Sequence, residues 1–124
     1  MKFIYIDGDN IGLKIEQSFL NNNEKNLFEI NLMVKNAIEN ISSYLLKENQ
    51  EIIFSGADGI ISKSVEINLS HLLKIVRSAD PNLTFSIGIG NTLSDSYIAL
   101  RYAKSFSKNI AVVLENENYK IVTR

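Results

Sequence analysis

The sequence lacks cysteine and contains a single proline and a single histidine. Without cysteine the chain has no disulfide framework, no thiolate metal site and no cysteine nucleophile. One imidazole, His71, is too few for a histidine-rich zinc centre. An excess of either charge is also missing, because the formal net charge is −1. This near-neutral balance argues against a broad basic face for duplex DNA but leaves room for a local phosphate pocket.

Long hydrophobic runs are absent as well, so the sequence predicts no membrane-spanning segment. The first apolar run is followed at once by acidic residues, which makes it too short for a signal peptide. What remains is ordinary for a globular protein, with 124 residues, 45% hydrophobic and 22% charged. We therefore expect one folded cytoplasmic domain, residues 1–124, that does not bind membranes.

The spacing of apolar residues predicts an alternation of short strands and amphipathic helices. Helices are expected at 11–19, at 27–45, at 69–76, and from Thr92 or Ser94 to Phe106; strands are expected at 3–6, 52–54, 60–61, 83–89, 110–114 and 119–122. The hairpin at 52–61 breaks the regular strand–helix alternation of a Rossmann fold. The order instead predicts an α+β, ferredoxin-like domain, with a mostly antiparallel sheet and helices packed on one face.

Acidic residues follow the first strand, in the run Asp7-Gly8-Asp9-Asn10. A carboxylate at the end of a buried strand lies at the sheet edge, where a ligand can reach it. The simpler interpretation is that Asp9 or Asn10 caps the next helix and Asp7 makes a turn. A calcium loop of the EF-hand type is excluded, because Ile11 and Ser18 stand where that loop needs oxygen ligands.

A second acid, Asp58, lies at the tip of the predicted hairpin. The small residues Gly56, Ala57 and Gly59 around it let backbone, metal and phosphate approach closely, and glycine tolerates a positive φ. Such a tip is also common in hairpins without function. Together with Asp7, however, Asp58 can hold one or two Mg²⁺ ions, since magnesium takes oxygen ligands from one or two carboxylates and substrate phosphates.

Two further segments fit a triphosphate. The amides of Asn10, Ile11 and Gly12 stand at a predicted helix start, where backbone N–H groups bind anions. Lys104 and Lys108 share a face of the last helix, where they can hold phosphates or simply form a solvated basic stripe. The glycines at 88 and 90 do not make a dinucleotide fingerprint, because Leu93 occupies the place of its third glycine.

These motifs in this order resemble GGDEF-type cyclases and the palm domain of the large subunit of type III CRISPR complexes. The resemblance covers nearly the whole chain and is strongest to the minimal CRISPR polymerases (mCpol), which are stand-alone palm proteins of bacterial defence systems. Three motifs carry it: Asp7-Gly8-Asp9 after a strand, the hairpin 56–59, and the segment 85–90 leading to Ala103-Lys104-Ser105-Phe106-Ser107-Lys108-Asn109.

The resemblance implies a palm-type nucleotidyl transferase that makes a cyclic di- or oligonucleotide signal from ATP or GTP, with ATP favoured. Asp7 and Asp58 would be the catalytic metal ligands, and Gly8 would add its carbonyl oxygen. Lys104 and Lys108 would bind phosphates, together with the backbone around 10–12 and 56–57. Mg²⁺ or Mn²⁺ is the implied cofactor, and a downstream receptor would read the product. Joining two triphosphates implies a symmetric homodimer with facing sites.

The chain also departs from the family pattern. Gly59 replaces the second acid of the hairpin motif, Ala57 its second glycine, and Ser107 a glycine near the C-terminus. Asp9 is a candidate to compensate for the missing acid. The departure at Gly59 keeps a second function open, a catalytically inert nucleotide-binding sensor that regulates a partner protein. A third alternative is hydrolytic opening of a purine nucleotide on the same fold, and a purely structural adaptor is the least favoured.

Overall fold

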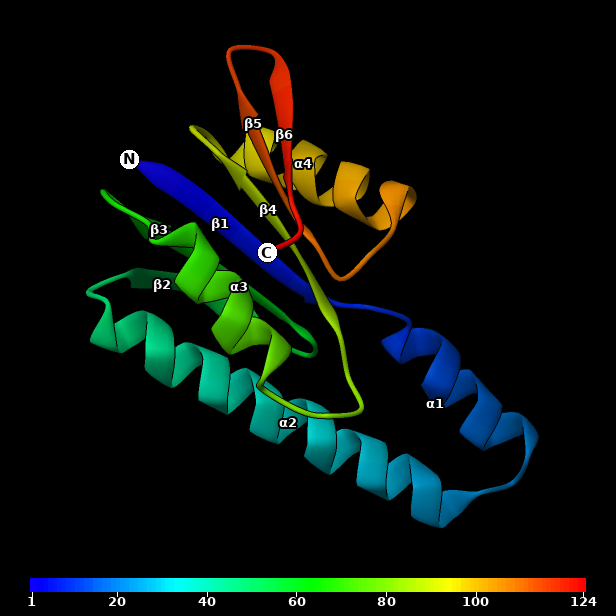
Figure 1. Ribbon diagram of the computed structural model, residues 1–124. Coiled ribbons are helices and arrows are strands. Elements are labelled where there is room, and N and C mark those ends of the chain that lie inside the picture. The colour runs from blue at the N-terminus through cyan, green and yellow to red at the C-terminus, as the bar shows by residue number, and fades with distance from the viewer.

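The computed structural model describes all residues, 1–124, as four helices and six strands (Figure 1). In chain order the elements are β1 (Lys2–Gly8), α1 (Ile11–Leu20), α2 (Glu24–Lys47), β2 (Glu51–Gly56), β3 (Gly59–Ser64), α3 (Leu69–Arg77), β4 (Phe85–Gly90), α4 (Leu93–Phe106), β5 (Ala111–Glu115) and β6 (Asn118–Val122). None of the helices combines the length and the hydropathy that crossing a membrane requires.

The strands form one sheet in the order β2-β3-β1-β4-β5-β6. β1 lies in the interior of the sheet and pairs antiparallel with both β3 and β4. The β4–β5 pair is parallel, because α4 carries the chain from one to the other as a crossover. The first four strands with α2 and α3 form the expected ferredoxin-like arrangement, so the predicted α+β class and mostly antiparallel sheet are confirmed.

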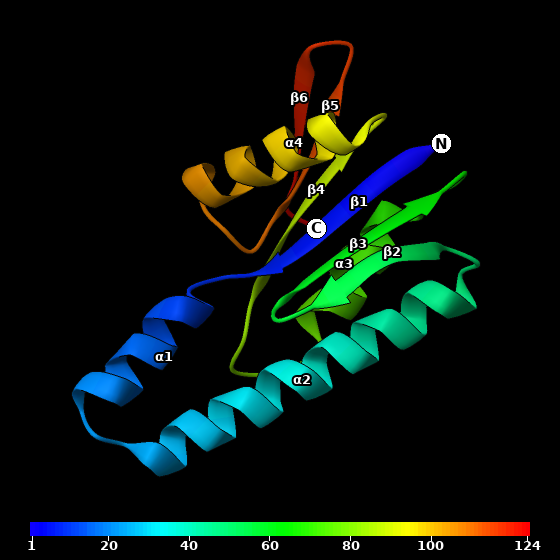
Figure 2. The ribbon, with the colours of Figure 1, turned by 180° about the vertical axis from the view of Figure 1, so that it is seen from behind.

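The prediction that the helices pack on one face of the sheet is wrong for α4. The main core lies between the sheet and α2 and α3, and β1 contributes Ile4 and Ile6 to it. A second core lies between α4 and β5, with Ala99 and Val112 among its members. Figures 1 and 2, which view the molecule from opposite sides, show α2 and α3 on one face and α4 on the other.

Two glycines of β4 explain how α4 reaches this second face. A Cβ atom on Gly88 would lie 2.3 Å from the backbone nitrogen of Leu100, and one on Gly90 would lie 2.4 Å from Asp95 Cβ. Ile87 and Ile89 alternate with these glycines and point into the main core. The strand thus presents side chains to one face and bare backbone to the other, which lets the backbone of α4 lie against the sheet.

Side-chain caps fix where three helices begin. Asn23 accepts a hydrogen bond from the backbone of Asn26 at the start of α2, and Asn68 accepts one from His71 at the start of α3. Of the two predicted caps of α4, Thr92 is the one used. At α1 the cap position is Asn10, but its φ is 58° and its side chain makes no capping bond. The α1 terminus is therefore not closed by the capping interaction that the sequence suggested.

Candidate active site

The two acids predicted to act together lie on neighbouring strands. Asp7 stands near the end of β1, and Asp58 lies in the turn between β2 and β3. The backbone N–H of Gly8 donates to the Asp58 carbonyl over 2.9 Å. An ideal Cβ on Gly8 would lie 3.2 Å from Asp58 Oδ2, so the Asp58 carboxylate packs against this glycine. Because Ile6 points into the main core, Asp7 points to the face that α4 covers.

The turn that carries Asp58 has an unexpected backbone. Gly56 pairs directly with Gly59, which leaves Ala57 and Asp58 as the turn residues. Ala57 has a φ of 50°, whereas no glycine of the chain has a positive φ. The expectation that glycine provides the left-handed conformation here is therefore wrong, and an alanine carries this strain.

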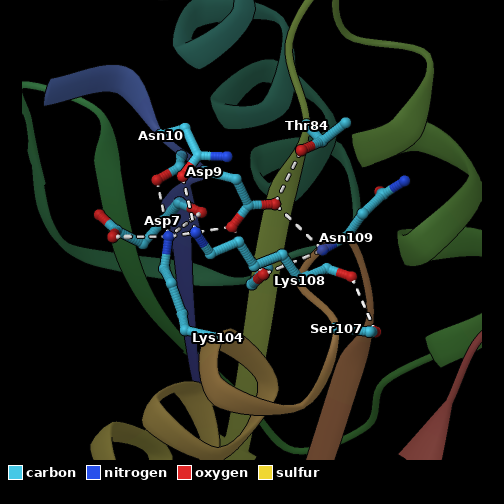
Figure 3. A network of polar contacts seen from close by, with 10 residues as sticks. Asp7, Asp9, Asn10, Thr84, Lys104, Ser107, Lys108 and Asn109 are labelled. Atoms are coloured by element: carbon cyan, nitrogen blue, oxygen red, sulfur yellow. Dashed lines mark hydrogen bonds and ion pairs between the residues drawn. The ribbon is translucent and has the colours of Figure 1, made fainter. Parts of the chain in front are cut away.

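Lys104 of α4 reaches into the same site (Figure 3). Its Nζ lies 2.6 Å from the Gly8 carbonyl oxygen and 3.3 Å from that of Asp7. It also lies 3.2 Å from Asp7 Oδ2 and 3.0 Å from Asp9 Oδ1. One ammonium group is thus bonded to both carboxylates and both carbonyls at the end of β1, and the predicted convergence of Lys104 with Asp7 and Gly8 is present.

Asp9 is buried and fully hydrogen-bonded, with 1% of its side chain exposed. Oδ1 accepts from Ser86 Oγ over 2.8 Å, in addition to Lys104. Oδ2 accepts from Thr84 Oγ1 over 2.8 Å and from the backbone N–H of Asn109 over 3.0 Å. A metal bond from Asp9 would have to replace one of these donors, so its surroundings are those of a residue that ties β1, β4 and α4 together.

Lys108 contacts Asn10, the residue that follows Asp9. Its Nζ is 2.6 Å from Asn10 Oδ1, which brings the end of α4 next to the start of α1. Lys108 and Asn109 have φ values of 61° and 54°. Asn109 compensates part of this strain, since its N–H is shared between Asp9 and Ser86. The prediction that Lys108 shares a face of the last helix with Lys104 is wrong, because α4 ends at Phe106 and Lys108 lies in the turn beyond it. Both lysines nevertheless reach the residues at the end of β1 and the start of α1.

Burial and neighbouring charges shift the pKa of Asp7. Burial raises the pKa of Asp7, Lys104 lowers it, and the Asp58 and Asp9 carboxylates raise it again, with a net shift upward. Burial also raises the pKa of the Tyr5 phenol, and Asp7 and Asp58 add to this shift. A cation at the end of β1 would favour the ionised form of Asp7.

A largely apolar cleft of about 640 Å³ opens beside Asp58. Its walls come from α1, α2 and the β2–β3 turn. The lining includes Ile11, Gly12, Ile15, Leu27, Phe28, Ala57 and Asp58, with Glu24 and Asn31 as further polar groups. Gly12, Ala57 and Asp58 are thus brought together as predicted. Gly56 does not line this cleft but borders a smaller cavity beside it. The Cα of Gly56 lies against the ring of Phe54.

The residues present fit a magnesium ion. Asp7, Gly8 and Asp58 offer oxygen atoms only, and the Lys104 ammonium shows that the oxygens of Asp7 and Gly8 already bind a cation. No three acidic or histidine side chains converge to form a complete metal cage. This is the pattern of Mg²⁺ sites that use one or two carboxylates and complete their shell with substrate phosphates and water.

The fold is that of a palm-type domain, with two acids at neighbouring strand ends. The chain resembles the structure of a diguanylate cyclase/phosphodiesterase from Caldicellulosiruptor saccharolyticus, with a TM-score of 0.60 and 17% identity over 96% of this chain and 78% of that one. It also resembles the adenylyl cyclase CyaB from P. aeruginosa, with a TM-score of 0.55 and 11% identity over 94% and 76% of the two chains. Both likenesses establish the fold.

The family follows from the sequence itself. Residues 3–114 match the minimal CRISPR polymerase domain, and the chain belongs to this mCpol family. No curated protein gives a significant match. Family and fold together support a function of the nucleotide cyclase or polymerase type.

Sequence reasoning missed two parts of the site. The polar residues Thr84 and Ser86 alternate with the apolar Leu83, Phe85 and Ile87, and this signal could have predicted a buried polar partner such as Asp9. The cleft walls on α2 were missed because Leu27 and Phe28 fit the hydrophobic periodicity of any amphipathic helix.

Proposed function

We propose that this protein is a Mg²⁺-dependent nucleotidyl transferase that joins nucleoside triphosphates into a cyclic di- or oligonucleotide and releases pyrophosphate. One observation carries the proposal. The carboxylates of Asp7 and Asp58 and the carbonyl of Gly8 gather at one end of the sheet, beside an apolar cleft and against the Lys104 ammonium.

Asp7, Gly8 and Asp58 are the residues that would hold Mg²⁺, or Mn²⁺ in its place. When bound, the ion neutralises phosphate charge and lowers the pKa of the attacking hydroxyl. The chain's own contribution is to fix these oxygens on two strands joined by the hydrogen bond from Gly8 to Asp58.

Cationic and backbone groups around the acids would hold the triphosphate. Lys104 extends from α4, Lys108 from the turn that follows it, and the first amides of α1 lie next to Lys108. The N–H groups of a helix's first turn have no partner within the helix, so those of Ile11 and Gly12 are suited to phosphate oxygens. Lys108 Nζ already lies 2.6 Å from Asn10 Oδ1.

The apolar cleft would take the nucleoside. It lies next to Asp58, so a base bound between α1 and α2 leaves its triphosphate near the acids. Glu24 and Asn31 are the polar groups that can distinguish one base from another there. ATP is the favoured substrate on the family relationship, with GTP as the competitor.

Each site holds one triphosphate, so linkage requires two sites that face each other. We propose a symmetric homodimer, in which a ribose hydroxyl from one site attacks the α-phosphorus in the other. The new O–P bond forms as the bond to the β-phosphate oxygen breaks, pyrophosphate leaves, and the hydroxyl proton passes to water. The product would act in the cytoplasm as a signal in antiphage defence and be read by a downstream receptor.

The test is to incubate the protein with ATP and GTP, separately and mixed, with Mg²⁺ or Mn²⁺, and to identify products by liquid chromatography–mass spectrometry. Asp58→Ala should give no product, whereas the matched variant Asp95→Ala, at the distant start of α4, should behave as the wild type. A cyclic nucleotide that persists with Asp58→Ala would overturn the assigned site.

A second function has one specific observation in its favour. Gly59 stands at the second acidic position of the hairpin, and no third acid takes its place among possible metal ligands. The chain would then be an inert sensor that binds nucleotide and regulates a partner. Tight, metal-dependent nucleotide binding with no product under any condition would favour this sensor over the enzyme.

A further inference from the structure

Lys104 bonds to the oxygens that the proposed function assigns to the metal, and the following inference rests on that function. Its Nζ lies 2.6 Å from the Gly8 carbonyl oxygen and 3.2 Å from Asp7 Oδ2. We propose that Lys104 is an exchangeable counter-ion. Its ammonium neutralises the end of β1 in the nucleotide-free protein and moves onto the triphosphate when metal and nucleotide bind together.

The distances imply that Lys104 and a bound Mg²⁺ would compete for the same oxygens of Asp7 and Gly8. Mg²⁺ binds its oxygen ligands at about 2.0–2.1 Å, so an ion on Gly8 and Asp7 would stand within a few ångströms of the present ammonium. Two cations that close repel each other strongly at the low effective dielectric of a half-buried site. Lys104, with 23% of its side chain exposed, must leave these two oxygens when the ion binds.

Asp9 limits how far Lys104 can move. Its carboxylate is fixed by Ser86, Thr84 and the Asn109 amide, and it keeps its own contact of 3.0 Å to the ammonium. A lysine side chain is a flexible four-carbon stem, so the ammonium can turn toward a phosphate while it stays near Asp9. Asp9 is thus a positioning residue that keeps the lysine at the entrance of the phosphate site.

This arrangement makes metal and nucleotide binding cooperative. Metal alone must displace Lys104 without providing a new partner for it, and binds weakly. A nucleotide brings phosphate oxygens that accept the displaced ammonium, so each ligand strengthens the other, as linkage requires.

The experiment measures Mn²⁺ binding by electron paramagnetic resonance, with and without a non-reactive ATP analogue, in wild type, Lys104→Gln and Lys108→Gln. Without nucleotide, Lys104→Gln should bind Mn²⁺ about tenfold or more tightly than the wild type, since it loses a charge-assisted competitor. Lys108→Gln removes the same charge nearby but touches Asn10 rather than the metal oxygens. It should change the affinity by less than about threefold, because the charge it removes is more distant and screened.

With the analogue present, Lys104→Gln should lose most of the gain in metal affinity that nucleotide gives the wild type. Lys104→Arg keeps a cation on the carboxylates, and its nucleotide-free affinity should stay near the wild-type value; circular dichroism checks that each variant is folded. Equal nucleotide-free affinities in wild type and Lys104→Gln would overturn the counter-ion inference. Absence of Mn²⁺ binding in every folded variant, even with the analogue, would instead overturn the proposed function.

Discussion

Gly59 is the direct strand partner of Asp7 in the antiparallel pair of β1 and β3. An ideal Cβ at Gly59 would lie 3.1 Å from Asp7 Oδ1 and 3.6 Å from the ring of Tyr5. The residue that replaces the family's second acid therefore lies against the first acid. Its missing side chain leaves the Asp7 carboxylate free to adopt its present position.

Gly59→Ala should reduce turnover by roughly tenfold, because small misplacements of a reacting group are costly and a shift near 1 Å can cost about 10²-fold. Gly59→Asp should be worse, since it places a like charge beside Asp7. Product formation by the two variants, measured with thermal unfolding to confirm the fold, tests this. A Gly59→Asp variant faster than the wild type would show that the site lacks an acid it needs.

Asp9→Asn and Asp58→Asn should affect different properties. Asn at position 9 cannot accept from every donor that surrounds the buried carboxylate, so unfolding should become easier by about 1–3 kcal/mol. The Asp58 carboxylate accepts no hydrogen bond from a buried donor. Asp58→Asn should therefore change the free energy of unfolding by less than about 0.5 kcal/mol, while activity is lost. Denaturant midpoints and product assays distinguish the two, and equal loss of stability would contradict the assignment.

Phe28→Ala should weaken nucleotide binding with little effect on stability. The ring lines the cleft but is 62% exposed, and removing a base-stacking aromatic costs about 1–3 kcal/mol, or roughly tenfold in KM. Phe19→Ala is the matched control, because Phe19 is 65% exposed and lies outside the lining of the cleft. Steady-state KM values for both variants decide the point; a similar rise in the two would exclude the cleft as the base site.

Asp7→Asn should inactivate the protein yet stabilise its fold at neutral pH without metal. Burial raises the folded-state pKa of Asp7 above its ordinary 3.8, so the folded protein holds this proton more tightly than the unfolded chain. Stability is therefore lost as pH rises from about 4 through the folded-state pKa. Guanidinium midpoints in EDTA should favour Asp7→Asn at pH 7, with a difference that shrinks toward pH 4. A difference independent of pH would contradict this account.

Gly88→Ala should destabilise the protein strongly. The new methyl group would lie 2.3 Å from both Ser96 O and Leu100 N, which belong to the backbone of α4 and cannot rotate away. Overpacking of this kind costs about 1–3 kcal/mol or more. Gly12→Ala meets nothing within 4 Å and should be tolerated or stabilising, by up to about 1 kcal/mol. The melting temperature should fall for Gly88→Ala and should stay the same or rise for Gly12→Ala.

The sequence predicted the order of the elements and the meeting of Asp7 with Asp58, because strand ends and a hairpin tip are local features of the chain. It did not predict the face on which α4 lies. The alternation of Ile87 and Ile89 with Gly88 and Gly90 contains that information, since bare backbone on one side of a strand indicates a closely packed neighbour. The interpretation of these glycines as a failed nucleotide motif hid this meaning.

Sequence reasoning also missed the role of Asp9. Its partners Thr84, Ser86 and Asn109 lie 75 or more positions away and are brought to it by sheet pairing. Periodicity shows which face of an element is buried, but it does not show which polar groups meet across a core. Asp9 therefore looked like a spare metal ligand, whereas the fold surrounds it with donors.

The two sides of the proposed nucleotide site differ in how firmly they are packed against the sheet. On the phosphate side, α4 lies directly on β4, so Lys104 is carried by a helix that cannot shift without disturbing the sheet. On the nucleoside side, the wall comes from α1, which packs chiefly on α2, and from the exposed Phe28. Mutations that accumulate on this wall can alter which base is accepted and leave the catalytic end intact. Under the proposed function, the base of the signal could therefore change without any change in the acids that carry the chemistry.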